Sequence, residues 1–307
     1  MAEGSRDFLD HAVLSRLMAL PMHARQPMIG GVSGMHRSPV KGSSLEFSEY
    51  RKYVPGDDLR RLDWRAWGRS DRYYVKEFEA DTNMRMILLL DVSGSMNFGE
   101  EGNTRFDYAR RLAGSLAYLA ANQGDSVGLW SAGTPLKKGG SAPVNLPARR
   151  GSNHLGLVLD SLGEIEAGGT TNLLESLHDA AEQIQQRAMI VILSDLFLET
   201  PELRSAIQHL RFRKHDVSVF HLLDQQELDF NFDRPARFVD LEGAEPILAD
   251  PDDVRKAYRE AVTNWIRGID EIIRTTTIDY HRVKLDEDYA DVLARFLLSR
   301  TPKKSGR

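Results

Sequence analysis

The chain has 307 residues, of which 41% are hydrophobic, enough for one or two domains with a substantial core. It contains no cysteine, which excludes disulfides, thiolate zinc sites and cysteine nucleophiles. Its formal net charge of −5 argues against a general nucleic-acid or anionic-membrane binder.

The N-terminal segment, residues 1–28, is predicted to form an amphipathic helix. Its apolar residues Leu9, Val13, Leu17 and Leu20 recur at helical spacing, which indicates a face that packs on the body of the protein or on a partner. Charged residues interrupt the segment, so it is a poor signal peptide, and the chain holds no run of about 20 apolar residues that would span a bilayer. We therefore expect a soluble, cytoplasmic protein with no transmembrane segment.

Residues 29–82 combine a Gly/Ser/Pro-rich loop at 29–44 with a segment dense in charged and aromatic residues. Residues 73–80 alternate like a half-buried strand, so the segment is predicted to be β-rich. Two roles are considered for its aromatic side chains. The first choice is that they fill the small core of a structural β-rich segment, and the second is that they form a surface for a partner. Binding of nucleic acid ranks well below both, because residues 45–81 hold eight Lys and Arg against nine Asp and Glu and so carry no net positive charge. The aromatic residues concerned are Phe47, Tyr50, Tyr53, Trp64 and Trp67.

Residues 83–300 alternate between buried strands and amphipathic helices. The apolar runs at 86–90 and 189–193 are typical of parallel strands covered on both faces. This alternation predicts an α/β fold with a doubly wound, mostly parallel sheet and helices on both faces, followed by a disordered tail at 301–307. Strands are expected at 84–91, 125–132, 187–195, 216–224 and 278–285, helices at 107–123, 152–165, 172–186, 201–213, 252–275 and 289–300, and a hairpin at 236–250.

Oxygen-bearing side chains follow two of the buried strands and begin one of the helices. Because the carboxyl ends of parallel strands meet at one edge of a sheet, we expect these groups to lie close together. Taken singly, each has an ordinary explanation as a turn or a helix cap. Their order, each at an element boundary, favours a site for a hard cation such as Mg²⁺, Mn²⁺ or Ca²⁺. The side chains are Asp91, Ser93, Ser95, Thr170, Thr171 and Asp195.

This arrangement resembles the von Willebrand factor A-like fold with its metal-ion-dependent adhesion site, whose motif is Asp-x-Ser-x-Ser, then Thr, then Asp. The resemblance implies that Ser93 and Ser95 ligate one divalent cation directly, with Mg²⁺ the first expectation and Mn²⁺ or Ca²⁺ the alternatives. It implies that Asp91 and Asp195 hold the ion largely through water.

A threonine completes the ligand set that the resemblance implies. We expect Thr171, because Asn-Leu and the helix follow it in the family's register, and Thr170 is the alternative. With few anionic ligands bound directly, the cation keeps net positive character and an open position. An Asp or Glu of a protein partner can occupy that position.

The residues before the sheet carry a second pattern: Gly-x-x-x-Glu-Phe at 42–47, a run of charged and aromatic residues from Tyr50 to Trp64, and Val-Lys-x-Phe at 75–78. This pattern is similar to the signature of the DUF58 family, and with it the resemblance spans nearly the whole chain. Members carry an A-type domain and are often encoded beside MoxR-type AAA+ ATPases. Many also have N-terminal membrane segments, and this chain departs from them in having none.

The resemblance implies a non-enzymatic, metal-dependent interaction module that serves a MoxR-type ATPase as adaptor or cofactor in the assembly or maturation of other proteins. The chain lacks a P-loop, and Ser93 lacks the first glycine of the α/β-hydrolase elbow. Ser93 also stands where phosphatases of the haloacid-dehalogenase type carry their second Asp. The alternative function is a metal-dependent hydrolase, such as a phosphatase, that uses the same oxygen-rich site.

Overall fold

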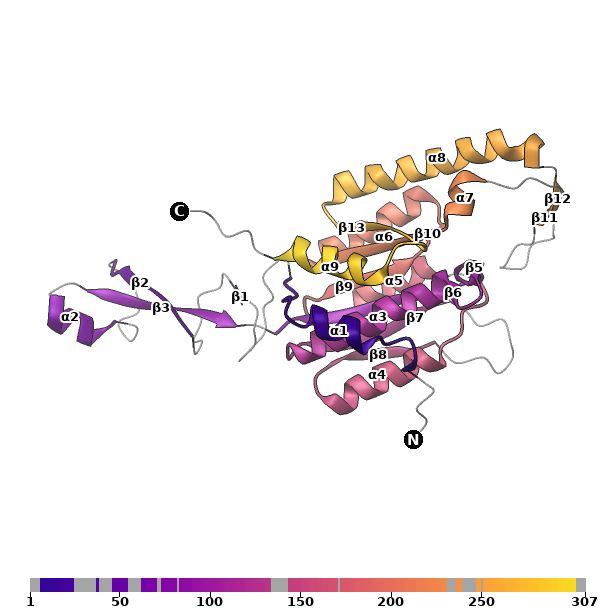
Figure 1. The fold of residues 1–307 in the computed structure, drawn as a ribbon. Coiled ribbons are helices and arrows are strands. Elements are labelled where there is room, and N and C mark those ends of the chain that lie inside the picture. The colour runs from indigo at the N-terminus through magenta and orange to yellow at the C-terminus, as the bar shows by residue number, and fades with distance from the viewer. Residues whose placement is uncertain are drawn as a thin grey trace. The chain divides into compact units, whose positions relative to one another are not determined.

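The computed structural model describes residues 6–24, 37–38, 46–54, 62–70, 73–81, 83–133, 143–170, 172–230, 236–238, 247–249 and 251–301. The chain forms two compact units (Figure 1). The smaller unit comprises residues 24–84, close to the segment 29–82 set apart by composition. The larger unit comprises residues 1–23 and 85–307.

The smaller unit is built on a three-stranded antiparallel sheet in the order β1-β3-β2. Its strands are β1 (Arg37–Ser38), β2 (Glu46–Lys52) and β3 (Tyr74–Asp81), and the expected strand at 73–80 corresponds to β3. A short helix that the sequence analysis did not predict, α2 (Trp64–Ser70), lies in the chain between β2 and β3.

The larger unit contains a six-stranded sheet in the order β13-β10-β9-β4-β7-β8. Neighbouring strands are parallel except β8, which pairs antiparallel with β7 at one edge. This confirms the expected mostly parallel, doubly wound α/β sheet, although the edge strand β8 was not expected. The strands are β4 (Arg85–Asp91), β7 (Ser126–Ala132), β8 (Asn145–Arg149), β9 (Met189–Ser194), β10 (Asp216–Leu223) and β13 (Asp279–Lys284).

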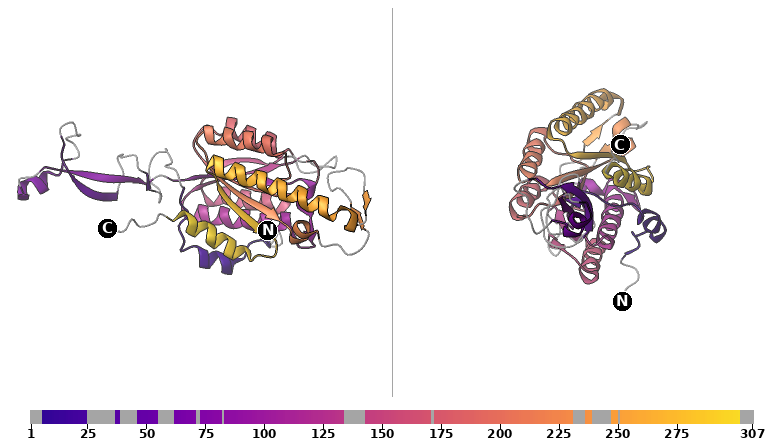
Figure 2. Two further views of the ribbon diagram at one scale, coloured as in Figure 1. Left: turned by 90° about the horizontal axis from the view of Figure 1, so that it is seen from above. Right: turned by 90° about the vertical axis from the view of Figure 1, so that its left-hand side faces the viewer.

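Helices cover both faces of this sheet (Figures 1 and 2). On one face α3 packs against the central strands and is flanked by α1, α4 and α9, whereas α5, α6 and α8 pack together over the other face. No helix in the described part of the chain is both long and apolar enough to cross a bilayer. The helices are α1 (His11–Leu17), α3 (Arg105–Asn122), α4 (Ser152–Glu164), α5 (Leu173–Gln183), α6 (Thr200–Phe212), α7 (Gln225–Asp229), α8 (Pro251–Thr276) and α9 (Tyr289–Arg300).

Three further elements are short. A 3₁₀ turn, η3 (Gly94–Asn97), follows β4, and a small hairpin of β5 (Gly99–Glu100) and β6 (Asn103–Thr104) leads into α3. The expected hairpin at 236–250 is represented by β11 (Ala236–Phe238) and β12 (Ile247–Ala249), which pair antiparallel. The expected disordered tail lies outside the described residues apart from Thr301.

The core explains why the central strands read as continuous apolar runs. Residues 86–91 of β4 and all of β9 are buried, because helices lie over both sides of these strands. On the face of α5, α6 and α8, Ile87 and Leu89 join a cluster with Leu177, Ile207 and Ile272. The ends of β4 and β9 are therefore held in a rigid frame.

Helix α1 is shorter than the helix expected for residues 1–28. It begins after Asp10, whose carboxylate accepts hydrogen bonds from the backbone of Ala12 and Val13, and it ends at Leu17, four residues before Pro21. Its buried residues face α3 and α9. The expected packing of an apolar face on the body of the protein is therefore present, over fewer turns.

Helix α3 begins with a capping box that positions the residue after it, Arg105. The Thr104 hydroxyl accepts a hydrogen bond from Asp107 N at 3.1 Å, and Asp107 Oδ2 accepts one from Thr104 N, also at 3.1 Å. We expect Thr104→Ala to lower the free energy of unfolding by about 1 kcal/mol, measured by urea denaturation. Thr263→Ala, on the exposed surface of α8, should change it by less than about 0.5 kcal/mol. Equal losses in the two variants would contradict a capping role for Thr104.

Candidate metal centre

The candidate site lies at the carboxyl edge of the sheet, where β4 and β9 run side by side. Leu90 of β4 pairs with Leu193 of β9, so Asp91 lies next to Ser194 as both strands end. The chain leaves β4 for β7 on one side, while β9 lies on the other side, and this is the switch point where open α/β sheets bind ligands. The topology therefore brings the two predicted segments together.

The third predicted segment is hydrogen-bonded to the loop after β4. Gly168 N donates to Val92 O at 2.8 Å, and Gly94 N donates to Gly169 O at 2.9 Å. Gly169 has a φ of 104°, a backbone conformation that side chains with a Cβ rarely adopt. These hydrogen bonds hold Gly168 and Gly169 against the loop after β4. The next residue, Thr170, is exposed.

The expected threonine ligand is not decided by this geometry. Thr171 lies outside the described residues, and Thr170 is next to it in a segment bonded to the loop that holds Ser93. The choice between Thr171 and Thr170 stays a prediction.

Two serine hydroxyls form the part of the site that suits a cation best. Ser93 Oγ and Ser95 Oγ are 3.0 Å apart. Two neighbouring ligands of an octahedral Mg²⁺, each at about 2.0–2.1 Å, are separated by about 2.9–3.0 Å. Ser93 is buried, whereas Ser95 is partly exposed. The pair therefore has the spacing of adjacent ligands and opens toward solvent on one side.

Asp91 lies beneath the serines and is almost fully buried, with 2% of its surface exposed. Its Oδ1 accepts from Ser93 N at 3.0 Å, and its Oδ2 accepts from the Ser194 hydroxyl at 2.7 Å. Burial, together with the negative charge of Asp195, raises the pKa of Asp91 to about 7. A bound cation would oppose both effects and favour the ionised carboxylate.

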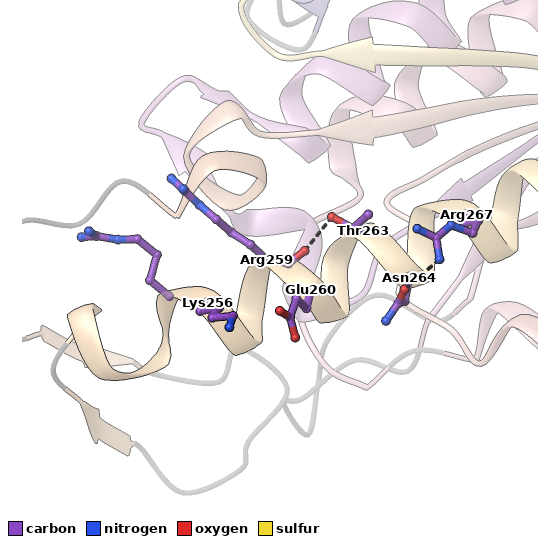
Figure 3. Close-up of a pocket in the computed structure, with 7 residues that line it drawn as sticks. Lys256, Arg259, Glu260, Thr263, Asn264 and Arg267 are labelled. Atoms are coloured by element: carbon purple, nitrogen blue, oxygen red, sulfur yellow. Dashed lines mark hydrogen bonds between the residues drawn. The ribbon is translucent and has the colours of Figure 1, made fainter.

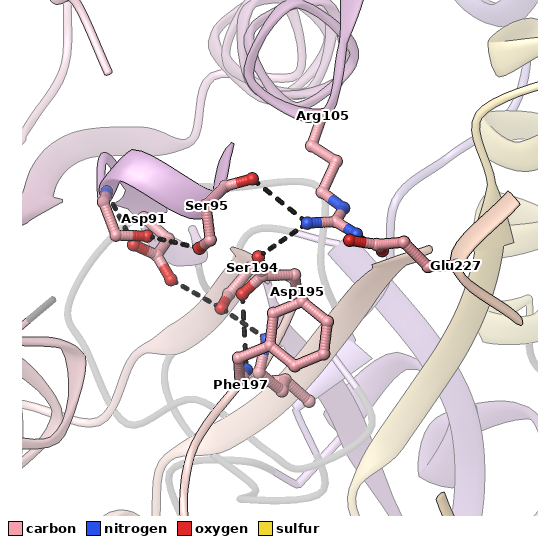
Figure 4. A network of polar contacts seen from close by, with 9 residues as sticks. Asp91, Ser95, Arg105, Ser194, Asp195, Phe197 and Glu227 are labelled. Carbon is pink, nitrogen blue, oxygen red and sulfur yellow. Dashed lines mark hydrogen bonds and ion pairs between the residues drawn. The ribbon is translucent and has the colours of Figure 1, made fainter. Parts of the chain in front are cut away.

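Asp195 is held by an arginine that the sequence analysis did not single out (Figure 4). Arg105 Nη1 donates to Asp195 Oδ2 at 3.1 Å and to the carbonyl oxygen of Ser95 at 3.0 Å. The same guanidinium forms an ion pair with Glu227 of α7. The other Asp195 oxygen, Oδ1, accepts from Phe197 N at 3.3 Å. Arg105 thus connects the loop after β4, the end of β9 and α7.

The charges around the site leave room for a divalent cation. Asp91, Asp195 and Glu227, when ionised, carry three negative charges, and Arg105 supplies one positive charge. No group of three or more His, Asp or Glu side chains in the described residues is placed to hold a metal. A cation would therefore depend on the serine hydroxyls, with the two aspartates, already bonded to protein donors, acting through water.

The structure brings together four of the predicted residues, namely Asp91, Ser93, Ser95 and Asp195. Sequence reasoning missed Arg105 and Glu227 as part of the site. One signal was present for Arg105: it is the first residue of a helix, where the helix dipole disfavours a cation unless an anion lies nearby.

An exposed aromatic ring borders the site. Leu196, directly after Asp195, has a φ of 55°, which is rare for a leucine, and the turn leaves Phe197 43% exposed. The Phe197 ring stacks on Trp265 of α8 with ring centroids 4.9 Å apart, and the Arg105 guanidinium lies over it at 5.2 Å. The rim therefore offers an apolar contact beside the hydroxyls.

A separate cavity of about 640 Å³ lies along α8 (Figure 3). It contains none of the predicted site residues. Four of the described residues that line it are cationic and one is acidic, so its chemistry differs from that of the sheet edge. Its described lining residues are Arg255, Lys256, Arg259, Glu260, Thr263, Asn264 and Arg267.

Among the solved structures that are similar to part of this chain are BatB and the SpRpn10 VWA domain. BatB from Bacteroides thetaiotaomicron, described as a conserved hypothetical protein, is 16% identical with a TM-score of 0.46, covering 71% of this chain and 98% of that one. The SpRpn10 VWA domain is 12% identical with a TM-score of 0.41, covering 70% of this chain and 95% of that one. Because these scores are low, the fold class rests on the order and direction of the strands.

Sequence comparison gives the family. Uncharacterized proteins of Mycobacterium tuberculosis (strain ATCC 25618 / H37Rv) and Mycobacterium bovis are each 26% identical over 306 residues, covering 96% of this chain and 92% of theirs. The family described as "Protein of unknown function DUF58" matches residues 49–265, more than half of the chain. The chain therefore belongs to the DUF58 family.

Proposed function

We propose that this chain is a metal-dependent protein-interaction module that binds a carboxylate of its partner through a divalent cation, with Mg²⁺ the first candidate. The observation that carries the proposal is the pair of hydroxyls on Ser93 and Ser95, 3.0 Å apart at the carboxyl edge of the sheet. Hydroxyl ligands are neutral, so the ion keeps positive character toward solvent. The exposed ring of Phe197 supplies an apolar contact beside it.

The partner we propose is a MoxR-type AAA+ ATPase, with this chain as its adaptor or cofactor in protein assembly or maturation. Support for this choice comes from membership in the DUF58 family, together with the implication of the family resemblance that members are often encoded beside such ATPases. The chemistry required of the partner is an accessible Asp or Glu, since a carboxylate is the ligand that an under-neutralised cation favours.

We further propose that the site is not catalytic. A carboxyl with a pKa of about 7 suits general acid–base chemistry, which favours the alternative of a metal-dependent hydrolase. However, Asp91 is 2% exposed and both of its oxygens accept hydrogen bonds from the protein, so it does not face a substrate. Purified protein with Mg²⁺ should hydrolyse neither phosphate monoesters nor esters. Metal-stimulated turnover that Asp91→Ala abolishes would establish the alternative.

The metal site is tested by titrating Mn²⁺ or Mg²⁺ into the protein in a calorimeter. We expect one site per chain, and we expect Ser93→Ala with Ser95→Ala to weaken binding by more than about 100-fold, because even outer-shell partners change metal affinity by about 10–100-fold. The matched control is Ser205→Ala on the exposed surface of α6, which should bind as the wild type does. Equal uptake by the double variant and the control would contradict the site.

Partner binding is a separate readout. A pull-down with a MoxR-type ATPase from the same organism should succeed in Mg²⁺, fail in EDTA, and fail with the double serine variant. If capture is the same in all three conditions, the metal does not mediate docking, whatever the calorimeter shows.

A further inference from the structure

Phe197 is a large apolar side chain that the fold leaves exposed beside the candidate metal centre (Figure 4). It follows Asp195 by two residues, and its backbone N–H donates to Asp195 Oδ1 at 3.3 Å. Among the exposed large apolar side chains described in the larger unit, Phe197 alone lies in a loop that carries a proposed site residue. The others lie on helices or at a helix end: Met18, Leu157, Phe212 and Leu298.

Exposure by itself does not indicate a binding role, as two rings of the smaller unit illustrate. Trp64 and Trp67 were expected first to fill a small core, and this expectation is wrong for both, because they are 59% and 38% exposed. The smaller unit contains none of the candidate site residues. Phe197 differs because the residues next to it are the ones proposed to bind a cation.

The backbone before Phe197 fixes the direction in which the residue leaves the sheet. Leu196 has a φ of 55°, which is rare for a residue with a Cβ, and its side chain is buried. Its N–H donates to the Ser194 hydroxyl at 2.8 Å, and the same hydroxyl donates to Asp91 Oδ2. Unfavourable backbone conformations persist where the surrounding structure enforces them, and they cluster at functional sites. The turn that exposes Phe197 is therefore built into the candidate metal centre.

The ring of Phe197 rests on other aromatic side chains. Its centroid lies 4.9 Å from that of Trp265, and Trp265 meets His221 edge to face at 5.1 Å. His221 is fully buried, and its Nδ1 lies 2.6 Å from the Tyr280 hydroxyl. A ring supported in this way loses little further freedom when a partner binds, which lowers the entropy cost of association.

Arg105 spans the gap between this ring and the loop that holds the serine pair. Its guanidinium carbon lies 5.2 Å from the centroid of the Phe197 ring, and its Nη1 donates to Ser95 O at 3.0 Å. Each residue of an extended chain spans about 3.3–3.6 Å, so a carboxylate at the serine pair and an apolar side chain on Phe197 can come from residues about one to three positions apart. One partner segment can therefore reach both.

Shielding of the buried ion pair accounts for only part of the Phe197 ring. Phe98 also lies against the Arg105 guanidinium, at 5.1 Å, and neither Arg105 nor Asp195 is more than 1% exposed. The ion pair beneath is thus already covered, yet 43% of Phe197 remains exposed. This remaining apolar surface is available to a partner.

We propose that Phe197 determines which carboxylates of a partner dock: it contacts an apolar side chain within about three residues of the Asp or Glu that binds the ion. This inference rests on the proposed function and adds to it the chemistry of the partner segment. An apolar side chain gains free energy when it is buried against the ring. A polar side chain in the same place loses water without gaining a hydrogen bond.

The test selects peptides from a phage-displayed library in which one central Asp is fixed and the three residues on each side vary. The full chain is immobilised in Mn²⁺, and bound phage are released with EDTA. We expect Leu, Ile, Met or Phe to be enriched at a flanking position with the wild type, but not with Phe197→Ser. In fluorescence anisotropy, a selected peptide should bind the wild type about tenfold more tightly than its Gly-flanked counterpart, and Phe197→Ser should not distinguish the two.

Two controls show whether the effect is specific to the Phe197 ring. Phe212→Ser removes an 83%-exposed ring from α6 and should keep the wild-type preference. In calorimetry Phe197→Ser should change the affinity for Mn²⁺ by less than about tenfold, the lower limit for outer-shell partners of a metal. Its circular dichroism spectrum should match that of the wild type. Phe197→Gln, which keeps part of the cover over Arg105, replaces the serine variant if that variant loses its fold.

The possible failures of this proposal and of the proposed function are distinguishable. If the wild type captures peptides in Mn²⁺ without an apolar preference, or if Phe197→Ser keeps that preference, this inference is wrong and carboxylate docking stands. If the wild type retains no peptide that EDTA releases, carboxylate docking is wrong, and this inference is wrong with it.

Discussion

Replacing Arg105 with methionine is expected to lower the free energy of unfolding of the metal-free protein by about 3–5 kcal/mol. Arg105 is fully buried and pairs with Asp195, which is 1% exposed, and with Glu227. Methionine fills much of the same volume, but it leaves the Asp195 carboxylate buried without its cation. Urea denaturation in EDTA near neutral pH measures the loss.

An exposed arginine provides the matched control. Arg204 pairs with Glu271 on the surface, where both side chains are substantially exposed, so Arg204→Met should cost less than about 1 kcal/mol. If Arg105→Met costs no more than the control, the buried ion pair does not stabilise the site. Added Mg²⁺ should stabilise the Arg105 variant more than the wild type, because the ion replaces part of the missing positive charge.

Replacing Asp91 with asparagine is expected to raise the free energy of unfolding of the metal-free protein at pH 8 by about 2–4 kcal/mol. This is the order of the free energy that corresponds to the raised pKa of Asp91. Burial and Asp195 raise the pKa of Asp91 in the folded state to about 7, above its value of 3.8 in an unfolded chain. The folded state therefore favours the protonated acid. That contribution is complete below the unfolded pKa and is lost as pH rises through about 7.

The effect of Asp91→Asn on the free energy of unfolding depends on pH. Wild-type stability in EDTA should fall as pH rises from about 4 to 7, and Asp91→Asn should remove that fall, so the two curves separate over this range. Asn keeps an oxygen for Ser93 N and can donate to the Ser194 hydroxyl. Asp160→Asn, on an exposed carboxylate, should follow the wild-type curve. A constant difference between Asp91→Asn and wild type at all pH values would contradict the shifted pKa.

Saturating Mg²⁺ should reverse the advantage of Asp91→Asn. The ion favours the ionised carboxylate of the wild type, whereas the amide offers no charge to it. The same denaturation series, repeated with Mg²⁺, measures the reversal.

The sheet could be predicted from the sequence because each buried strand is marked by a continuous apolar run within the strand itself. The apolar runs that became β4 and β9 could only be buried on both faces, and parallel strands end at the same edge. Asp91 and Asp195 therefore converge without any knowledge of side-chain positions. The meeting of Ser93 and Ser95 follows from their spacing after one strand.

What the sequence did not predict depends on contacts between distant residues. Arg105 and Asp195 are 90 positions apart, and the position of Arg105 at a helix start indicates only that some anion lies nearby, without identifying Asp195. Helix α2 is only seven residues long and contains Gly68, so it has little periodicity to detect. The edge strand β8 contains a proline and alternates between exposed and half-buried residues, as edge strands do.

The chain places the smaller unit between two stretches that both belong to the larger one. Before it, Met22 N donates to Gln123 Oε1 and His23 O accepts from Arg300; after it, the chain continues directly into β4. The smaller unit is thus an insertion, and deleting residues 24–84 removes no strand of the six-stranded sheet and no residue of the candidate metal centre. A chain from which this unit has been genetically excised would therefore keep Ser93 and Ser95 but lack the exposed rings of Trp64, Trp67 and Tyr73.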